Sequence, residues 1–238
     1  MPTIAFVSPK GGAGKTTSAF LLATALTRFQ EVTVIDADPN HPIENWARGG
    51  NTPAGLTVVS DVDEDTIIER IEEAASQTPY VVVDLEGTAS TTVVYAISQA
   101  DFVVIPTQGS QLDATEASRA IRVVRQSQKV SKSKTVTPFA VLLTRTSPSV
   151  RTRTQTHIQK GLIDAGIPVF EVELNERDAF RAVFSFQQTL DGLNPAEVAN
   201  LEKARMNVFE FVKEILERLK RLEGDSEEDE TSNIAGAA

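Results

Sequence analysis

Short apolar runs rich in β-branched residues alternate along the chain with longer segments in which apolar residues recur every three or four positions. The short runs predict seven strands, at 3–7, 32–35, 57–59, 81–84, 102–106, 137–143 and 169–172. The longer segments predict helices at 16–29, 63–76, 89–99, 112–130, 151–165 and 177–186, and a long final helix at 196–221. This alternation is typical of an α/β fold, a mostly parallel, doubly wound sheet with helices on both faces.

The pattern shows no repeat and no internal linker, so residues 1–222 are expected to form one domain. From Glu223 onward the chain is polar, charged and without periodicity, which predicts a disordered tail at 223–238. No apolar stretch approaches the roughly 20 residues that span a bilayer. A strand that begins at residue 3 leaves no room for a signal peptide, and we therefore expect a cytoplasmic location. The absence of cysteine excludes disulfides and thiolate metal sites.

Charge is segregated along the sequence. The net charge is −10, but six acidic residues lie in the tail, which leaves about −4 for residues 1–222. In contrast, the window 117–163 contains no acidic residue and ten of the 23 lysines and arginines. The overall acidity therefore does not exclude a polyanionic partner such as a nucleic acid.

The first strand is followed by the octet Lys-Gly-Gly-Ala-Gly-Lys-Thr-Thr at positions 10–17. Its glycines permit positive φ and allow successive backbone N–H groups to approach an anion, and the next helix directs its positive end toward the same place. Lys15 can reach terminal phosphates and the Thr16 hydroxyl can ligate Mg²⁺. The residues predicted to bind the phosphates are Gly11, Gly12, Ala13, Gly14, Lys15, Thr16 and Thr17.

This octet departs from the usual phosphate-loop pattern G-x-x-x-x-G-K-[ST]. Pro9 stands where the first glycine of that pattern belongs, and Lys10 is a second lysine that phosphate binding alone does not require.

Three aspartates follow predicted strands. Asp36 and Asp38 end the second strand and Asp84 ends the fourth. Strand ends of a parallel sheet meet at one edge, where ligands bind in such folds. A single aspartate at this position is more often a helix cap or a turn residue. Beside a phosphate loop, however, the three carboxylates predict a magnesium-nucleotide site.

Taken together, these motifs resemble the ParA/MinD family of deviant Walker A ATPases. The octet at 10–17, Asp-Ala-Asp-Pro at 36–39 and Asp-Leu-Glu-Gly at 84–87 carry the resemblance, with weaker matches at 105–107 and 175–181. It covers residues 1–222. The chain is most similar to short ParA-type plasmid partition ATPases that lack an N-terminal helix-turn-helix, and also to ATPases that assist conjugative or virulence-plasmid transfer.

The resemblance implies a slow, Mg²⁺-dependent hydrolysis of ATP by a homodimer that forms on ATP binding. Lys10 would reach the phosphates bound by the other subunit, Lys15 would bind the β- and γ-phosphates, and Asp38 would position the attacking water. Thr17 would contact an inner phosphate. The metal ligands implied are Thr16, Asp36 and Asp84.

Two departures from the family pattern concern the nucleotide site. Leu85-Glu86-Gly87 follows Asp84 where many relatives have a proline. The sixth strand ends in Thr144-Arg145, where many relatives have an asparagine that reads adenine. The adenine-binding residues therefore cannot be assigned from the sequence.

Arginines in the acid-free window are candidates for DNA binding. Arg119, Arg122 and Arg125 recur every three residues and share one helix face, and Arg151 and Arg153 continue the run. An ordinary solvated helix face is the alternative interpretation. Interleaved aromatic residues are lacking, which favours the duplex backbone over stacked single strands. By resemblance, Arg177 occupies a position of DNA contact, and the predicted DNA-binding residues are Arg151, Arg153 and Arg177.

The resemblance predicts a ParA-type ATPase that binds non-specific double-stranded DNA on the nucleoid and positions plasmid DNA, with a centromere-binding partner that stimulates hydrolysis. One alternative is an accessory ATPase of DNA transfer. Another is a MinD-like ATPase whose final amphipathic helix binds membrane, but the acidic tail argues against that interpretation. His41 and His157 lack metal-ligand spacing.

Overall fold

A computed structural model describes residues 1–8, 11–87, 90–109, 111–127 and 137–235. In this part of the chain, seven parallel strands form one sheet in the order β3-β2-β4-β1-β5-β6-β7. The strands are β1 (Thr3–Phe6), β2 (Val32–Ala37), β3 (Leu56–Val59), β4 (Tyr80–Leu85), β5 (Phe102–Gln108), β6 (Phe139–Thr146) and β7 (Leu174–Asn175). The predicted doubly wound α/β sheet is confirmed.

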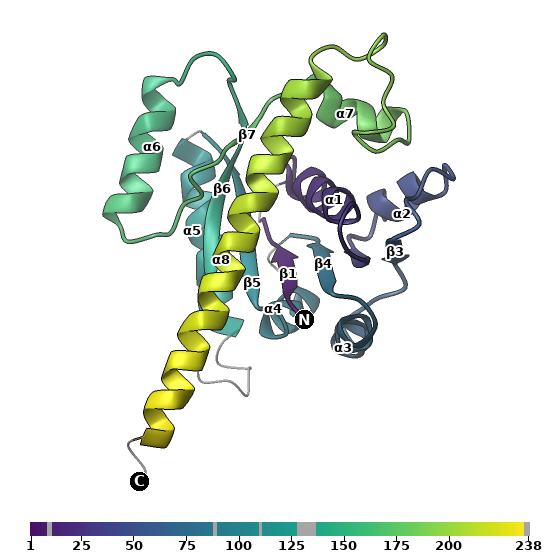
Figure 1. The fold of residues 1–238 in the computed structure, drawn as a ribbon. Helices are drawn as coiled ribbons and strands as arrows, with labels where there is room; N and C mark the ends of the chain where they lie inside the picture. The colour runs from purple at the N-terminus through teal and green to yellow at the C-terminus, as the bar shows by residue number, and fades with distance from the viewer. Residues whose placement is uncertain (9–10, 88–89, 110, 128–136, 236–238) are drawn as a thin grey trace.

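Helices cover both faces of this sheet (Figure 1). One layer consists of α1 (Lys15–Leu26), α2 (Pro42–Ala47), α7 (Asp178–Ser185) and α8 (Leu201–Ala235). The other consists of α3 (Ile67–Gln77), α4 (Thr91–Ser98), α5 (Gln111–Ser127) and α6 (Arg153–Asp164).

The alternation of side chains along each strand divides the core between these two layers. In β1, Ile4 and Phe6 pack with α1 and α8, whereas Ala5 and the adjoining Val7 pack with the layer of α3 to α6. All four side chains are fully buried. A strand covered on both faces needs apolar residues at every position, and this explains the continuous apolar runs in the sequence.

The strand order reverses at β1. The chain first builds the sheet outward through β2 and β3 and later continues on the other side of β1 through β5, β6 and β7. Loops that leave β1 and its neighbours diverge at such a point and open a crevice at the carboxyl ends of the strands. The glycine-rich octet follows β1 and therefore lies at this crevice.

Helix α8 packs its apolar stripe against the sheet, as the sequence predicts. Its buried residues include Val208, Phe211, Val212, Ile215 and Leu219. Phe209, which the sequence places on the same stripe, is 53% exposed. Among the described residues, no helix combines the length and the apolar character that crossing a bilayer requires.

The tail differs from the sequence-based expectation. Instead of losing regular structure at Glu223, α8 continues to Ala235 and runs to the foot of the molecule (Figure 1). Glutamate is a good helix former, and extending a helix that is already anchored avoids the unfavourable nucleation step. The division of the chain at residue 222 stays a prediction.

The last predicted strand is wrong in position. An isolated bridge joins Val169 to Val141, but the strand itself is Leu174–Asn175. The backbone N–H groups of Glu171 and Val172 donate instead to the Glu214 carboxylate of α8. An apolar run predicts burial, and it does not reveal that a side chain rather than a strand satisfies the backbone.

Candidate functional site: a phosphate loop with three carboxylates

The glycine-rich loop joins β1 to α1. Gly12 and Gly14 have φ of 83° and 89°, in the left-handed region that favours glycine. A Cβ at Gly14 would also lie 3.4 Å from Thr144, whereas one at Gly12 would meet nothing within 4 Å. Because α1 begins at Lys15, the unpaired N–H groups of its first turn face the same end of the sheet as the loop. The predicted residues 11–17 are thus contiguous at the carboxyl ends of the strands and could bind an anion together.

Two neighbouring strands hold this loop in place. At the end of β5, Gln108 Nε2 donates to the Gly12 carbonyl at 2.8 Å. Near the end of β6, Thr144 Oγ1 donates to the Ala13 carbonyl at 2.7 Å. The sequence noted Thr144 only as a departure from an adenine-reading asparagine and gave no role to Gln108. Their position after apolar strands beside the predicted phosphate loop was the available signal.

Lys15 is held between two of the three predicted carboxylates. Its Nζ lies 2.7 Å from Asp84 Oδ1 and 3.6 Å from Asp38 Oδ2. The lysine side chain is 11% exposed and the Asp84 side chain is fully buried. The structure therefore brings together the lysine of the first strand's loop and acids from the ends of β2 and β4, as the sequence predicts.

Asp84 is a buried carboxylate with one oxygen engaged. Burial raises the pKa of Asp84, and the charge of Lys15 opposes that rise. Its Oδ2 is buried and accepts no hydrogen bond from the described residues. A second acceptor oxygen is thus available beside the phosphate loop.

Asp36 has a different environment from Asp84. Its Oδ2 accepts hydrogen bonds from the backbone N–H groups of Ile43, at 2.8 Å, and Glu44, at 2.9 Å. These groups lie in the first turn of α2, so the carboxylate caps a six-residue helix that the sequence did not predict. Burial raises the pKa of Asp36 to about 6, against those backbone hydrogen bonds and with a contribution from the nearby charge of Asp84.

Asp38 is the least buried of the three acids, with 20% of its side chain exposed. Burial raises its pKa, but the hydrogen bonds from Asn40 and the charge of Lys15 outweigh burial and hold the pKa of Asp38 below its ordinary value. The Asn40 backbone and side chain both donate to Oδ1 at 3.0 Å. Asp38 therefore stays ionised at neutral pH.

The donor set fits Mg²⁺ held jointly with a nucleotide. No group of three or more acidic or histidine side chains within the described ranges is placed to hold a metal alone. Mg²⁺ in nucleotide sites usually takes only one or two carboxylates and completes its coordination with phosphates and water. Oδ2 of Asp84 and Oδ1 of Asp36 are buried oxygens without a hydrogen-bond partner in the part of the chain that the structure describes. Together with Thr16, they are the groups that would hold it.

A hollow beside the loop lies between the start of α1, the end of β6 and the start of α7. It is lined by Gly14, Thr17, Ser18, Thr144, Arg145, Leu174, Asn175, Glu176, Arg177, Phe180 and Arg181. Arg145 has a φ of 53°, a conformation that non-glycine residues rarely adopt. The sequence assigned Thr17 to the phosphates and Arg177 to DNA, and it gave the other residues of this hollow no ligand-binding role beyond the phosphate loop itself.

The predicted DNA-binding arginines have unlike environments. Arg151 forms an ion pair with Glu173, and Arg177 donates to Asn175 Oδ1 at 3.1 Å; burial lowers the pKa of Arg177. Arg153 is exposed in the first turn of α6. Arg177 is half-buried and lines the hollow beside the phosphate loop.

A second basic group lies on α5, which packs against α6. Its exposed arginines are Arg119, Arg122 and Arg125. Lys10, the predicted catalytic lysine supplied across a dimer, lies outside the described residues.

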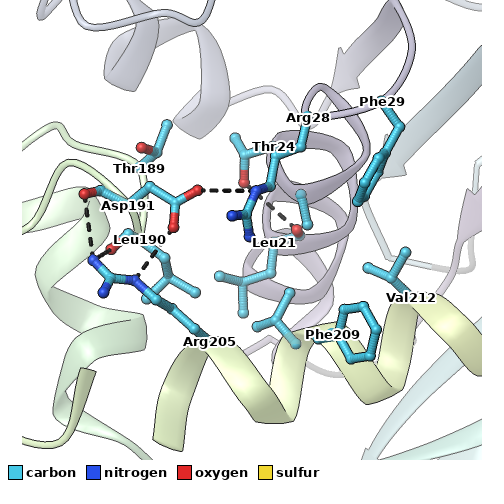
Figure 2. Close-up of a pocket in the computed structure, with 12 residues that line it drawn as sticks. Leu21, Thr24, Arg28, Phe29, Thr189, Leu190, Asp191, Arg205, Phe209 and Val212 are labelled. Atoms are coloured by element: carbon cyan, nitrogen blue, oxygen red, sulfur yellow. Dashed lines mark hydrogen bonds and ion pairs between the residues drawn. The ribbon is translucent and has the colours of Figure 1, made fainter. Parts of the chain in front are cut away.

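Another hollow lies at the far end of α1 from Lys15 (Figure 2). It lies between the end of α1 and α8. On one side of it, Asp191 forms ion pairs with both Arg28 and Arg205. Phe29 and Phe209 line it and are 67% and 53% exposed. None of the predicted nucleotide-site residues contributes to it.

A parallel sheet with a glycine-rich phosphate loop at its switch point, an ion-paired lysine and strand-end aspartates defines a P-loop nucleotide hydrolase. The comparisons with known proteins specify this class. The model of the VirC1 protein family matches residues 1–223, and the chain belongs to that family.

Individual relatives agree with this assignment. The chain is 36% identical over 223 residues to Protein ParA of Rhizobium radiobacter, covering 91% of this chain and all of the relative. It is 32% identical over 189 residues to Protein virC1 of Rhizobium rhizogenes, covering 77% and 80%. The crystal structure of a ParA family ATPase from Chlorobium tepidum shares the fold, with a TM-score of 0.70 at 16% identity, covering 89% of this chain and 98% of the other. The resemblance to the ParA/MinD ATPases is confirmed, and the chain is a ParA-type ATPase.

Proposed function

We propose that this protein hydrolyses Mg²⁺-ATP as an ATP-dependent dimer that binds non-specific DNA and positions plasmid DNA in the cell. The observation that carries the proposal is Lys15, whose ammonium is held 2.7 Å from Asp84 beneath a loop with two positive-φ glycines. The match to Protein ParA supports the same function.

The loop and the first turn of α1 bind the phosphates, and Lys15 moves from Asp84 to the β- and γ-phosphates. Asp84 then loses its counter-charge in a buried position, which makes this carboxylate a good partner for a cation. Magnesium would neutralise the charge that develops on the phosphates during transfer. Thr16, Asp84 and the free oxygen of Asp36 would hold it.

Asp38 positions the attacking water. Its depressed pKa keeps it an acceptor at neutral pH, and its Oδ1 is already fixed by Asn40. Phosphoryl transfer through a loose transition state requires positioning more than a strong base, so an ionised carboxylate is sufficient even with a lowered pKa.

The nucleoside lies in the hollow beside the loop, between β6 and α7. Phe180 offers an apolar contact and Asn175, Glu176 and Arg177 offer hydrogen-bonding groups. Many relatives have an asparagine where this chain has Thr144, and Thr144 is engaged with the phosphate loop. The side chains of this hollow would therefore take over the binding of the nucleoside from that asparagine.

Substitution of Lys10 tests whether hydrolysis requires a dimer. Supplied by one subunit to the phosphates of the other, it would neutralise transition-state charge only after dimerisation. We expect Lys10→Ala to abolish hydrolysis and weaken ATP-driven dimerisation while ATP still binds, whereas Lys15→Ala should lose ATP binding itself. Phosphate release, light scattering and calorimetry measure the three properties. Normal hydrolysis by a monomeric Lys10→Ala variant would refute the proposal.

The exposed arginines of α5 and Arg153 are better candidates for DNA contact than Arg151 and Arg177, whose side chains already have partners in the protein. An Arg153→Glu variant should bind duplex DNA more weakly and with a shallower salt dependence, with ATP affinity unchanged. Arg70→Glu, on α3, makes the same change of charge and is the matched control. Equal DNA affinities of the two variants would remove Arg153 from the interface.

A second candidate is the accessory ATPase of DNA transfer. The observation that favours it is that the matching family model and one of the relatives described above carry the name VirC1 rather than ParA. Binding confined to a transfer origin in a mobility-shift assay would support this candidate, and plasmid loss on deletion would support partition. A stimulating partner protein is expected in either case.

A further inference from the structure

The nucleoside side of the site is attached to the C-terminal helix through the edge of the sheet. Strand β7 has only two residues, and an edge strand leaves backbone groups without strand partners. Helix α8 supplies the missing partners from side chains on one of its faces. Glu214 accepts from the N–H groups of Glu171 and Val172, at 3.0 and 2.8 Å.

Asn207 lies two turns before Glu214 on α8 and makes the corresponding contacts closer to the hollow beside the phosphate loop. Its Oδ1 accepts from the Asn175 backbone N–H at 3.0 Å, and its Nδ2 donates to the Glu173 carbonyl at 2.7 Å. An amide side chain can accept from one backbone group and donate to another in this way, whereas an ionised carboxylate has no hydrogen to donate.

The contacts of Asn207 continue to side chains that line the hollow. Arg177 Nε makes a long contact of 3.5 Å with Asn207 Oδ1, and Arg177 Nη2 donates to Asn175 Oδ1 at 3.1 Å. Asn175 Nδ2 in turn donates to Thr146 Oγ1 at 2.9 Å, which ties the network to β6. Asn175 and Arg177 both line the hollow, whereas Asn207 does not.

We infer that Asn207 is a positioning residue for the nucleoside side of the ATP site, which rests on the proposed function. It fixes the backbone at Asn175 and the direction of the Arg177 guanidinium, and these two residues face the nucleoside. Glu214 anchors the same segment farther along, at residues that do not line the hollow. The two α8 side chains thus share a structural role, and Asn207 alone also acts on the ligand.

The test compares Asn207→Ala with Glu214→Ala by calorimetry, using Mg²⁺-ATP and Mg²⁺-tripolyphosphate as ligands. We expect Asn207→Ala to weaken ATP binding about tenfold, the effect of one lost polar contact, and to leave tripolyphosphate binding unchanged. Both variants should unfold at a lower urea concentration than the unmodified protein. Glu214→Ala should lower the urea midpoint at least as much as Asn207→Ala does, but it should change ATP affinity less than about twofold. Equal losses of ATP affinity in the two variants would reduce Asn207 to a structural residue.

Asn207→Asp separates the two halves of the contact. It keeps the oxygen that accepts from Asn175 and Arg177 and loses the donor to Glu173, so ATP affinity should recover toward that of the parent while the urea midpoint stays low. An Asn207→Asp variant that binds ATP as weakly as Asn207→Ala would overturn the inference. If the unsubstituted protein bound tripolyphosphate as tightly as ATP, or bound neither ligand, the proposed function would be refuted rather than the role of Asn207.

Discussion

The carboxyl ends of β2 and β4 look alike in the sequence and differ in the folded protein. Each strand is a buried apolar run that closes on an aspartate, and Asp36 and Asp84 are paired in register across the sheet. Asp84 contacts the Lys15 ammonium, whereas Asp36 accepts the backbone N–H groups of α2. A strand-end aspartate therefore acquires its role from the segment that folds over it. Beside β4 that segment is the phosphate loop, and beside β2 it is a helix start.

The rate of ATP hydrolysis should differ most between variants of Asp84 and variants of Asp36. Asp84→Asn removes the charge next to Lys15 and one candidate metal ligand, and we expect the rate of phosphate release to fall about 100-fold or more. Asp36→Asn keeps its acceptor oxygen for α2 and also loses a candidate metal ligand, but Lys15 keeps its partner Asp84, so we expect the rate to fall less than about tenfold. Steady-state phosphate release at saturating ATP measures both.

Circular dichroism should show both variants folded. Equal rates for Asp84→Asn and Asp36→Asn would mean that the two strand ends contribute alike, and the distinction between them would be lost.

The pH dependence of stability should identify Asp36 by its raised pKa. A folded-state pKa of about 6 lies above the ordinary value of 3.8, so the folded protein binds this proton more tightly than the unfolded chain. The free energy of unfolding should fall, relative to that of Asp36→Asn, as the pH rises from about 4 to about 6. The expected difference is at most about 3 kcal/mol. Urea titrations across this range measure it, and parallel curves for the two proteins would contradict the assignment.

Removing the cap altogether should have the smallest effect of the three. Asp36→Ala leaves the N–H groups of Ile43 and Glu44 without their acceptor, and we expect it to be about 1–2 kcal/mol less stable than Asp36→Asn at pH 7. Urea unfolding of the two variants gives the difference. Should Asp36→Ala prove as stable as Asp36→Asn, the helix start would be held by other contacts.

The local part of the site could be predicted from the sequence because its residues are contiguous or end a strand. Gly11 to Thr17 form one loop and the first turn of α1, and the sheet topology places Asp36, Asp38 and Asp84 at the same edge. Periodicity also identified the sheet and seven of the eight helices among the described residues, because burial on one or both faces imposes a regular apolar pattern.

What the sequence missed depends on contacts between distant segments. Helix α2 has only six residues and is stabilised by Asp36, so it is too short to show the repeating apolar pattern that predicts a helix. The strand predicted at 169–172 does not form in full, and Glu214, more than 40 residues later, accepts the backbone N–H groups of Glu171 and Val172. Gln108 and Thr144 gained their roles only when β5 and β6 came to lie beside the phosphate loop.

Trp46 gives the fold around Asp36 an optical signal. It is the chain's only tryptophan, lies on α2, and is 2% exposed. Its indole packs edge-on against Phe20 of α1, with ring centroids 4.6 Å apart, and its Nε1 donates to the Val183 carbonyl at 3.0 Å. Any event that moves α2 away from α1 and α7 will expose this indole to water. Intrinsic fluorescence at a single emission band can therefore follow the β2 end of the site in the unlabelled protein.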